Sequence, residues 1–294
     1  HFDHQRASVV LGFTITAGNV PQTDSIHTYQ TDFPSLAGRQ EEMRQKITQS
    51  LDYAKNAVPV VPGTYTCVFS PVTAGVFAHE SFGHKSEADL MLGSETMMQE
   101  WAIGTQVGSP ILNILDSGLP EGSGYVPYDD EGTRTRTTYL IHNGILTGRL
   151  HSAATAALLN EEVTGNARAI NFSYEPIVRM TATYIGGGEL TLEELLAPIE
   201  LGVYIHDFNH GSGMSTFTIA PNKAYMIRNG KLAEPVRISV VTGSVMHTLH
   251  EIDGLTKDVK VCSLSTGGCG KMEQWPLRVA FGGPYVRVRN IQVQ

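Results

Sequence analysis

The sequence predicts an α+β fold of mostly antiparallel β-sheets, with a barrel-like core and one helix that carries ionisable side chains. Glycine accounts for 30 of the 294 residues and charged residues for only 17%, which favours short strands and tight turns over long helices. Two Asn-Gly pairs, at 143–144 and 229–230, lie between apolar runs and are typical of two-residue hairpin turns. Strand-like runs dominate the second half of the chain, so antiparallel pairing is expected there.

The first 58 residues predict a strand, a polar loop and a helix. Residues 7–16 are mostly apolar, which is typical of a strand in the middle of a sheet. We therefore expect that other strands of this sheet come from a part of the protein before residue 1. A helix is expected over about 38–57, because apolar residues recur there at steps of three and four, and Pro59 ends it. The recurring residues are Met43, Ile47, Leu51, Ala54 and Val58.

Beyond a buried strand at Val60–Phe69, the pattern predicts short elements. The stretch 91–128 is expected to be loop with short pieces of structure, and short helices are expected at about 152–162 and 192–197. The expected strands are Thr181–Ile185, Val203–Phe208, Thr216–Ile219, Val236–Val241, Val259–Cys262, Leu277–Phe281 and Tyr285–Val293.

The helix after the buried strand carries the sharpest chemical signal. Ser70 is a good N-cap and Pro71 suits the first helical position, so the helix is expected to run from Pro71 into the 80s. An apolar first turn leads into the run His79-Glu80-Ser81-Phe82-Gly83-His84. Ionisable groups on a buried helix need pairing or coordination, which points to a metal site.

The two histidines are five residues apart, whereas a metal-binding pair on a regular helix is four apart. Five residues leave the second imidazole about 140° around a regular helix from the first. A π-bulge brings such residues onto one face, and Gly83 lowers the steric cost of a local distortion before His84. On spacing alone, a metal site and a hydrogen-bonded cluster of histidines and glutamate both remain open.

A zinc hydrolase needs a third protein ligand and leaves the fourth position to water. Cys269 stands out because it lies in the glycine-rich turn Thr266–Lys271, although an incidental thiol in a turn explains it as well. Cys67 and Cys262 are expected to be buried core cysteines. The remaining candidates are Glu87, Asp89, His206, His210, His247 and His250. His206, Asp207 and His210 could also bind a second metal or line a substrate pocket, although a strand-end histidine next to an aspartate is more often simply hydrogen-bonded.

Composition argues against several function classes. The net charge is −8, which disfavours nucleic acid and polybasic membrane contacts. No apolar run reaches the roughly 18 residues that a spanning helix needs, so no membrane insertion is expected. Three cysteines cannot all pair within one chain and no secretory leader is evident, so a cytoplasmic location is expected.

Several separate blocks resemble the TldD/PmbA family, also known as modulators of DNA gyrase, from about Val60 to Val293. They are Val72–Asp89, Asp129–Thr133, Thr164–Arg168 and Gly267–Lys271. The resemblance implies that His79, His84 and Cys269 hold zinc, with Glu80 as the catalytic acid/base. It also implies that residues 1–58 are the remnant of an N-terminal α/β domain and residues 59–294 the metallopeptidase domain.

The resemblance further implies a zinc-dependent peptidase that cleaves unfolded peptides or proteins. Such proteins pair with an identical chain or with a PmbA/TldE-like sister subunit. The sisters lack the metal motif that this chain has, which favours the catalytic side. The alternative is a non-catalytic, peptide-binding or regulatory subunit. A DNA-directed activity, which the gyrase label suggests, fits poorly with the acidic charge.

Overall fold

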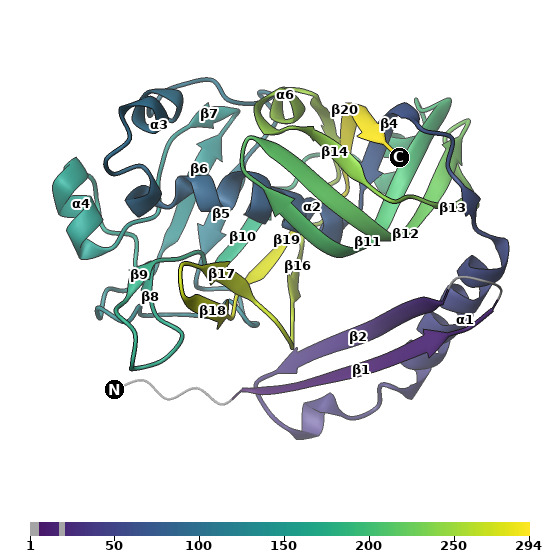
Figure 1. Cartoon of the computed structure of the whole chain (residues 1–294), viewed down its shortest axis with the longest axis horizontal. Helices are drawn as coiled ribbons and strands as arrows, with labels where there is room; N and C mark the ends of the chain where they lie inside the picture. The colour runs from purple at the N-terminus through teal and green to yellow at the C-terminus, as the bar shows by residue number, and fades with distance from the viewer. Residues whose placement is uncertain (1–5, 18–20) are drawn as a thin grey trace.

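Two β-structures lie on either side of one central helix in a computed structural model that describes residues 6–17 and 21–294 (Figure 1). The helix is α2 (Pro71–Ala78), which packs against barrel strand β11 and against strands β10, β16 and β19 of the second sheet. An N-terminal hairpin with helix α1 lies to one side of both structures.

The first β-structure is a barrel of five strands. Its strands follow the order β11, β4, β20, β14 and β12, and the pairing of β12 with β11 closes the ring. All of these pairs are antiparallel except β4 with β11. The predicted α+β class with a barrel-like core is therefore confirmed. The bounds are β4 (Gly63–Phe69), β11 (Leu201–Gly213), β12 (Thr216–Arg228), β14 (Val241–Ser244) and β20 (Val286–Val293), with β13 (Lys231–Arg237), β3 (Val58–Pro59) and β15 (Ile252–Leu255) attached at the edges.

The second β-structure is a six-stranded sheet in the order β16, β19, β10, β5, β6 and β7, antiparallel except for β10 with β19. Its strands are β16 (Lys260–Ser263), β19 (Ala280–Gly283), β10 (Ala182–Ile185), β5 (Ile114–Ser117), β6 (Thr137–His142) and β7 (Ile145–Leu146). Two small ladders complete the β-structure: β8 (Ala167–Arg168) with β9 (Ile177–Val178), and β17 (Cys269–Lys271) with β18 (Gln274–Leu277).

The remaining helices are short. They are α3 (Glu95–Glu100), α4 (Ala153–Leu159), α5 (Leu192–Leu196) and α6 (Val245–His250), with single 3₁₀ turns at Pro34–Leu36, His84–Ser86 and Ala88–Leu90. The segment 91–128, predicted to be loop with short pieces of structure, contains the short helix α3 and the fully buried strand β5. Among the described residues, no helix is long and apolar enough to span a bilayer.

Local turn and cap signals were accurate. Asn143 and Asn229 adopt φ angles of 51° and 49° at their hairpin turns, the left-handed conformation that such turns require. The hydroxyl of Ser70 accepts a hydrogen bond from the backbone N–H of Thr73, with Pro71 at the first helical position. The start of α2 is therefore where the sequence predicts it.

The N-terminal unit differs from the prediction. The expected polar loop after β1 (Ala7–Ile15) is in part a second strand, β2 (Gln22–Gln30), and β1 pairs with β2 alone among the described residues. The sequence signal was weak because the buried face of β2 includes Asp24 and Thr28 rather than apolar residues alone. Helix α1 (Gln40–Asn56) is confirmed. The division at residue 58 stays a prediction, and residues 1–5 and 18–20 lie outside the described part.

Helix α2 is pressed so closely onto the second sheet that one position requires glycine. A Cβ on Gly75 would lie 2.6 Å from the Cα of Gly282 in β19, which is backbone and cannot move aside cheaply. We therefore expect Gly75→Ala to lower the free energy of unfolding by about 1 to 3 kcal/mol through overpacking, as measured by urea unfolding. The matched control is Gly12→Ala on the exposed face of β1, where the nearest atom is 3.9 Å from the added carbon. An equal loss in both variants would contradict this account.

Candidate metal centre

The helix widens at the point that the spacing of the histidines demands. After α2, residues His79–Gly83 form a π-helical turn in which the backbone N–H of His84 donates to the carbonyl of His79. The predicted π-bulge is thus confirmed, and it turns His79 and His84 to the same side. Their ring centroids are 5.1 Å apart with the planes at 81°.

The role expected for Gly83 was wrong in its mechanism. Its φ of −55° and ψ of −51° are ordinary helical angles, so the distorted turn does not need the freedom of glycine. The missing side chain matters for packing, because a Cβ at Gly83 would overlap the sulfur of Met180. Gly83 lets the widened turn press against its neighbour.

Cys269 is brought to the two histidines from far along the chain. It begins β17, and its Sγ lies 3.4 Å from Nε2 of His84. One ligand atom from each of His79, His84 and Cys269 lies within 4.8 Å of the others. Cys269 and His79 are only 4% and 3% exposed, whereas the side chain of His84 is 16% exposed, so solvent reaches this group of three mainly at His84.

The surroundings favour a thiolate at Cys269. Burial by itself raises a thiol pKa, as it does at Cys67 in the barrel wall. At Cys269 burial acts the same way, but the neighbouring His79 and His84 outweigh it and lower the pKa far below the ordinary 9.0. Burial lowers the pKa of His84, yet hydrogen bonds to Cys269 and Glu87 raise it overall. A thiolate is the form that a metal takes as a ligand.

Glu80 lies beside this group with its carboxylate uncommitted. Its side chain is partly exposed, and in the part of the chain that the structure describes it makes no hydrogen bond or ion pair. Two glycines of β11 lie close to Glu80. A Cβ at Gly211 would be 3.5 Å from the side-chain Cγ of Glu80, and a Cβ at Gly213 would be 2.8 Å from the backbone carbonyl oxygen of Glu80. The carboxylate is therefore free to act on a substrate or a water.

Glu87 and Asp89, weighed as ligands from the sequence, are not part of the group of three. Glu87 is fully buried, and its Oε2 lies 3.3 Å from Nδ1 of His84, on the far side of the ring from Cys269. Asp89 instead pairs with Lys271, at 2.6 Å. Sequence reasoning assigned no role to Lys271, although its position two residues after Cys269 was a signal that both side chains lie on one face of a strand.

The other candidate ligands lie elsewhere among residues 6–17 and 21–294. Cys67 is fully buried in β4, as expected, whereas Cys262 in β16 is only partly buried. His206 receives or donates a hydrogen bond at 3.1 Å with the Tyr204 hydroxyl, in keeping with a simple structural role. His210 lies on β11, and His247 and His250 lie on the exposed side of α6.

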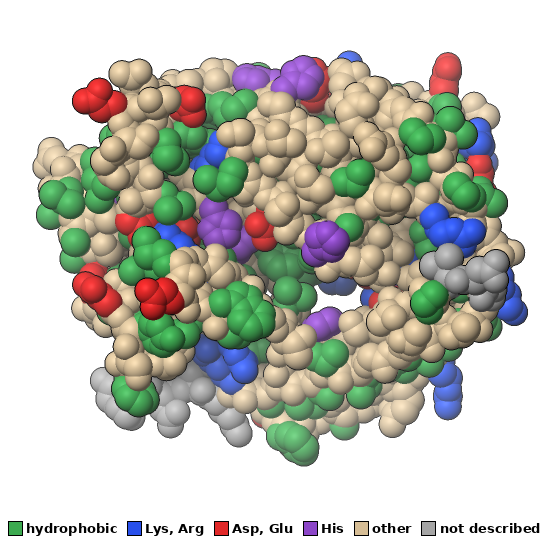
Figure 2. Space-filling model, viewed as in Figure 1, with side chains coloured by type: hydrophobic (Ala, Val, Ile, Leu, Met, Phe, Trp, Pro, Cys, Tyr) green, Lys and Arg blue, Asp and Glu red, His purple; other side chains and the backbone are tan. Residues whose placement is uncertain are grey.

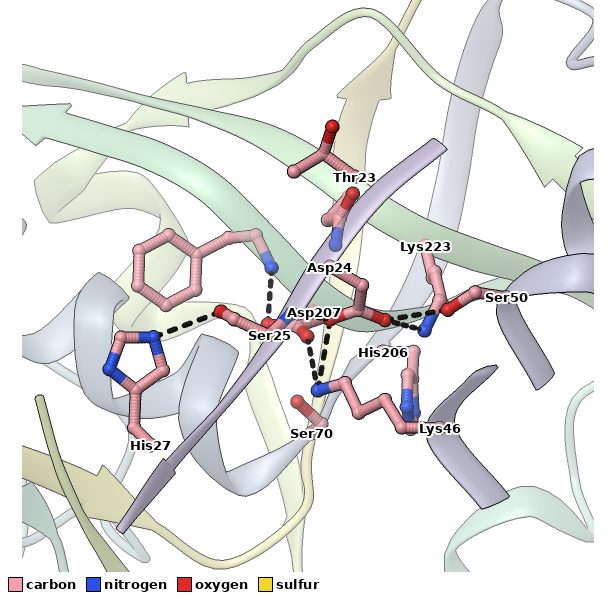
Figure 3. A network of polar contacts seen from close by, with 12 residues as sticks. Thr23, Asp24, Ser25, His27, Lys46, Ser50, Ser70, His206, Asp207 and Lys223 are labelled. Carbon is pink, nitrogen blue, oxygen red and sulfur yellow. Dashed lines mark hydrogen bonds and ion pairs between the residues drawn. The ribbon is translucent and has the colours of Figure 1, made fainter. Parts of the chain in front are cut away.

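A second polar cluster lies at the opposite end of α2 (Figure 3). Lys46 of α1 lies 3.2 Å from Asp24 and 3.4 Å from Asp207, and the buried Lys223 also pairs with Asp24. Asp24, Lys46 and Asp207 line a cavity of about 990 Å³ whose walls include β2, β11, β16 and the start of α2. His206 and Asp207, weighed from the sequence as residues of a pocket, both line this cavity, whereas Asp24, Lys46 and Lys223 were not singled out. Figure 2 shows the surface hollowed between the N-terminal hairpin and the body of the molecule.

Two histidines from one helical run and a distant thiol form a group that could hold a metal ion. A family model described as the PmbA/TldA metallopeptidase C-terminal domain matches residues 62–294. The chain therefore belongs to the PmbA/TldD family, as the sequence blocks implied.

Individual relatives agree with this family. A protein named a metalloprotease in Synechocystis is 41% identical over 87% of this chain and 56% of its own length. A zinc metalloprotease TldD homolog of Saccharolobus solfataricus is 33% identical over 79% of this chain and 52% of its own length. The crystal structure of TldE from Thermococcus kodakarensis shares the fold, with a TM-score of 0.76 at 20% identity, over 98% of this chain and 62% of that one. The chain thus spans about half the length of the curated relatives it matches.

The lowered pKa of Cys269 predicts when its thiolate forms. In metal-free protein, the ultraviolet absorbance of the thiolate should rise at a pH well below 9.0, because the imidazoles stabilise the charged form. The signal is the difference between the wild type and Cys269→Ser. Replacing His84 by Gln removes one stabilising partner, so the midpoint should move upward. A wild-type midpoint at or above 9.0 would refute this electrostatic account.

Proposed function

We propose that this chain carries the catalytic centre of a zinc-dependent peptidase, with His79, His84 and Cys269 as the metal ligands and Glu80 as the catalytic acid/base. The observation that supports this most is the approach of three ligand atoms to within 4.8 Å. Three protein ligands and a fourth position left open are typical of catalytic zinc sites.

The residues present fit zinc. Two imidazoles and one thiolate are a donor set that Zn²⁺ accepts. Nδ1 of His79 is buried and has no hydrogen-bond partner in the described structure, a costly arrangement for a site with nothing to bind. A relative from Saccharolobus solfataricus bears the name zinc metalloprotease, which supports the same metal here. Bound zinc would supply Lewis-acid polarisation of the scissile carbonyl and of a water molecule.

Glu80 would handle the proton in both halves of the reaction. Its carboxylate accepts a proton from the attacking water as the water oxygen bonds to the peptide carbonyl carbon. The same proton then passes from Glu80 to the amide nitrogen as the C–N bond breaks, which releases an amine and a carboxylic acid. Glu80 suits this role because it follows His79 directly in the chain and is held by no other described side chain.

The proposed substrate is a peptide or an unfolded protein. The relatives named metalloproteases support this class. The working unit is proposed to be a homodimer or a heterodimer with a PmbA/TldE-like sister subunit, in the cytoplasm. Neither a nucleic acid nor a membrane is a proposed partner.

Glu80→Gln should abolish cleavage of an unfolded protein while zinc stays bound. Loss of general acid/base catalysis costs about 10²- to 10⁴-fold in rate, and the amide cannot take up the proton. Turnover is followed by the release of new amino termini, and zinc by elemental analysis, where about one zinc per chain is expected. The matched control is Glu189→Gln on the surface, which should keep wild-type activity.

Each contrary outcome has a distinct meaning. Loss of zinc from the Glu80→Gln variant would make Glu80 a ligand and refute its role as acid/base. Wild-type turnover by the variant would place the acid/base elsewhere. A wild-type chain that takes up no zinc when supplied with it would favour the alternative, a non-catalytic peptide-binding or regulatory subunit.

A further inference from the structure

Lys271 is a buried lysine on the same strand and the same face as Cys269. Side chains two residues apart on a strand point the same way, and in β17 both Cys269 and Lys271 are buried while Gly270 between them is exposed. The lysine side chain is only 5% exposed. Burying an ammonium group is costly unless it is paired, so its partners reveal what it does.

All the partners of Lys271 lie on the segment that follows the π-helical turn or on β9. Nζ is 2.6 Å from Oδ1 of Asp89, 2.8 Å from the carbonyl oxygen of Val178 and 3.1 Å from Oε2 of Glu87. An ammonium group has three protons to donate, and three acceptors surround it. The lysine therefore ties the strand bearing the thiol to the segment bearing His84.

Glu87 continues this connection to the imidazole. Its Oε2 is shared between Nζ of Lys271 and Nδ1 of His84, which is 3.3 Å away. The other ring nitrogen of His84 lies 3.4 Å from Sγ of Cys269. The contacts form a closed circuit: Cys269 to His84, His84 to Glu87, Glu87 to Lys271, and Lys271 back to Cys269 through two peptide units.

We propose that Lys271 is a positioning residue of the metal centre, which through Glu87 fixes the ring of His84 and through β17 fixes the thiolate of Cys269. This inference rests on the proposed function, since it assigns a role at the same site. Residues that hold a histidine by its second nitrogen orient it toward the metal, and losing them typically costs roughly 10- to 100-fold in metal affinity. Lys271 does not touch His84 directly but acts through Glu87, and it also holds the strand that carries Cys269, so it affects two proposed ligands at once.

A second buried lysine supplies the control. Lys223 of β12 is fully buried and pairs with Asp24, far from the proposed ligands. Lys271→Met, the test variant, removes the ammonium group beside the proposed ligands and nearly keeps the length of the side chain. Lys223→Met, the control, removes a buried ammonium group elsewhere and therefore shows how much of any change comes from lost stability alone.

The test loads the full chain with cobalt(II) in place of zinc and records its absorption spectrum, together with zinc affinity by chelator competition. Lys271→Met should bind zinc roughly 10- to 100-fold more weakly and show a weakened, shifted thiolate-to-cobalt charge-transfer band. Lys223→Met should keep the wild-type spectrum and affinity. Should Lys271→Met fail to fold, Asp89→Asn weakens the same lysine contact and should shift the band in the same direction.

If Lys271→Met keeps the wild-type spectrum and zinc affinity, the inference is overturned, while the proposed zinc site still stands. If Lys271→Met does not fold, the same result in Asp89→Asn overturns the inference. Equal changes in Lys271→Met and Lys223→Met would overturn it as well, because both would then report only lost stability. A wild-type chain that gives no cobalt band sensitive to Cys269→Ser would refute the proposed function itself, and the inference with it.

Discussion

The widened turn at His79–Gly83 is the constraint on which the centre depends. On a regular helix, His84 would point about 140° away from His79, and no hairpin placement could make both rings meet one thiol. The π-helical turn is held in place by close packing on both sides. Gly75 admits the backbone of β19, and Gly83 admits the sulfur of Met180. A larger residue at either place would push the helix away from the sheet that supports it.

The polar groups near this turn fall into two kinds. Glu87 and Lys271 are buried and joined by an ion pair, as a low-dielectric interior requires. The Glu80 carboxylate, Nδ1 of His79, Oγ of Ser81 and Oε1 of Glu87 have no partner among the described residues. Of these, Nδ1 of His79 and the Glu80 carboxylate belong to residues of the proposed centre, so binding and chemistry are expected there.

Features set by neighbours in the chain were predictable. The Ser70 cap, the Asn-Gly turns and the π-bulge each depend on residues within one or two turns, so the sequence was sufficient for them. The proposed third ligand, Cys269, lies 185 positions from His84, and spacing left nine candidates open that only tertiary packing could separate. Strand β2 was missed because it buries Asp24, whose charge is balanced by Lys223 from a distant strand.

Two buried lysines hold the two ends of α2 in the same way. Lys223 pairs with a carboxylate 199 residues away and docks the N-terminal hairpin onto the barrel beside the start of α2. Lys271 pairs with Asp89 across 182 residues and docks the β17–β18 hairpin beside the π-helical turn. A buried charge left unpaired costs several kcal/mol, so each lysine disfavours any packing of its hairpin that separates it from its carboxylate partner. The first network frames the cavity and the second frames the proposed ligands, and the two share no residue. The cavity and the geometry of the proposed metal centre are thus supported by separate sets of contacts, so each can be perturbed without the other.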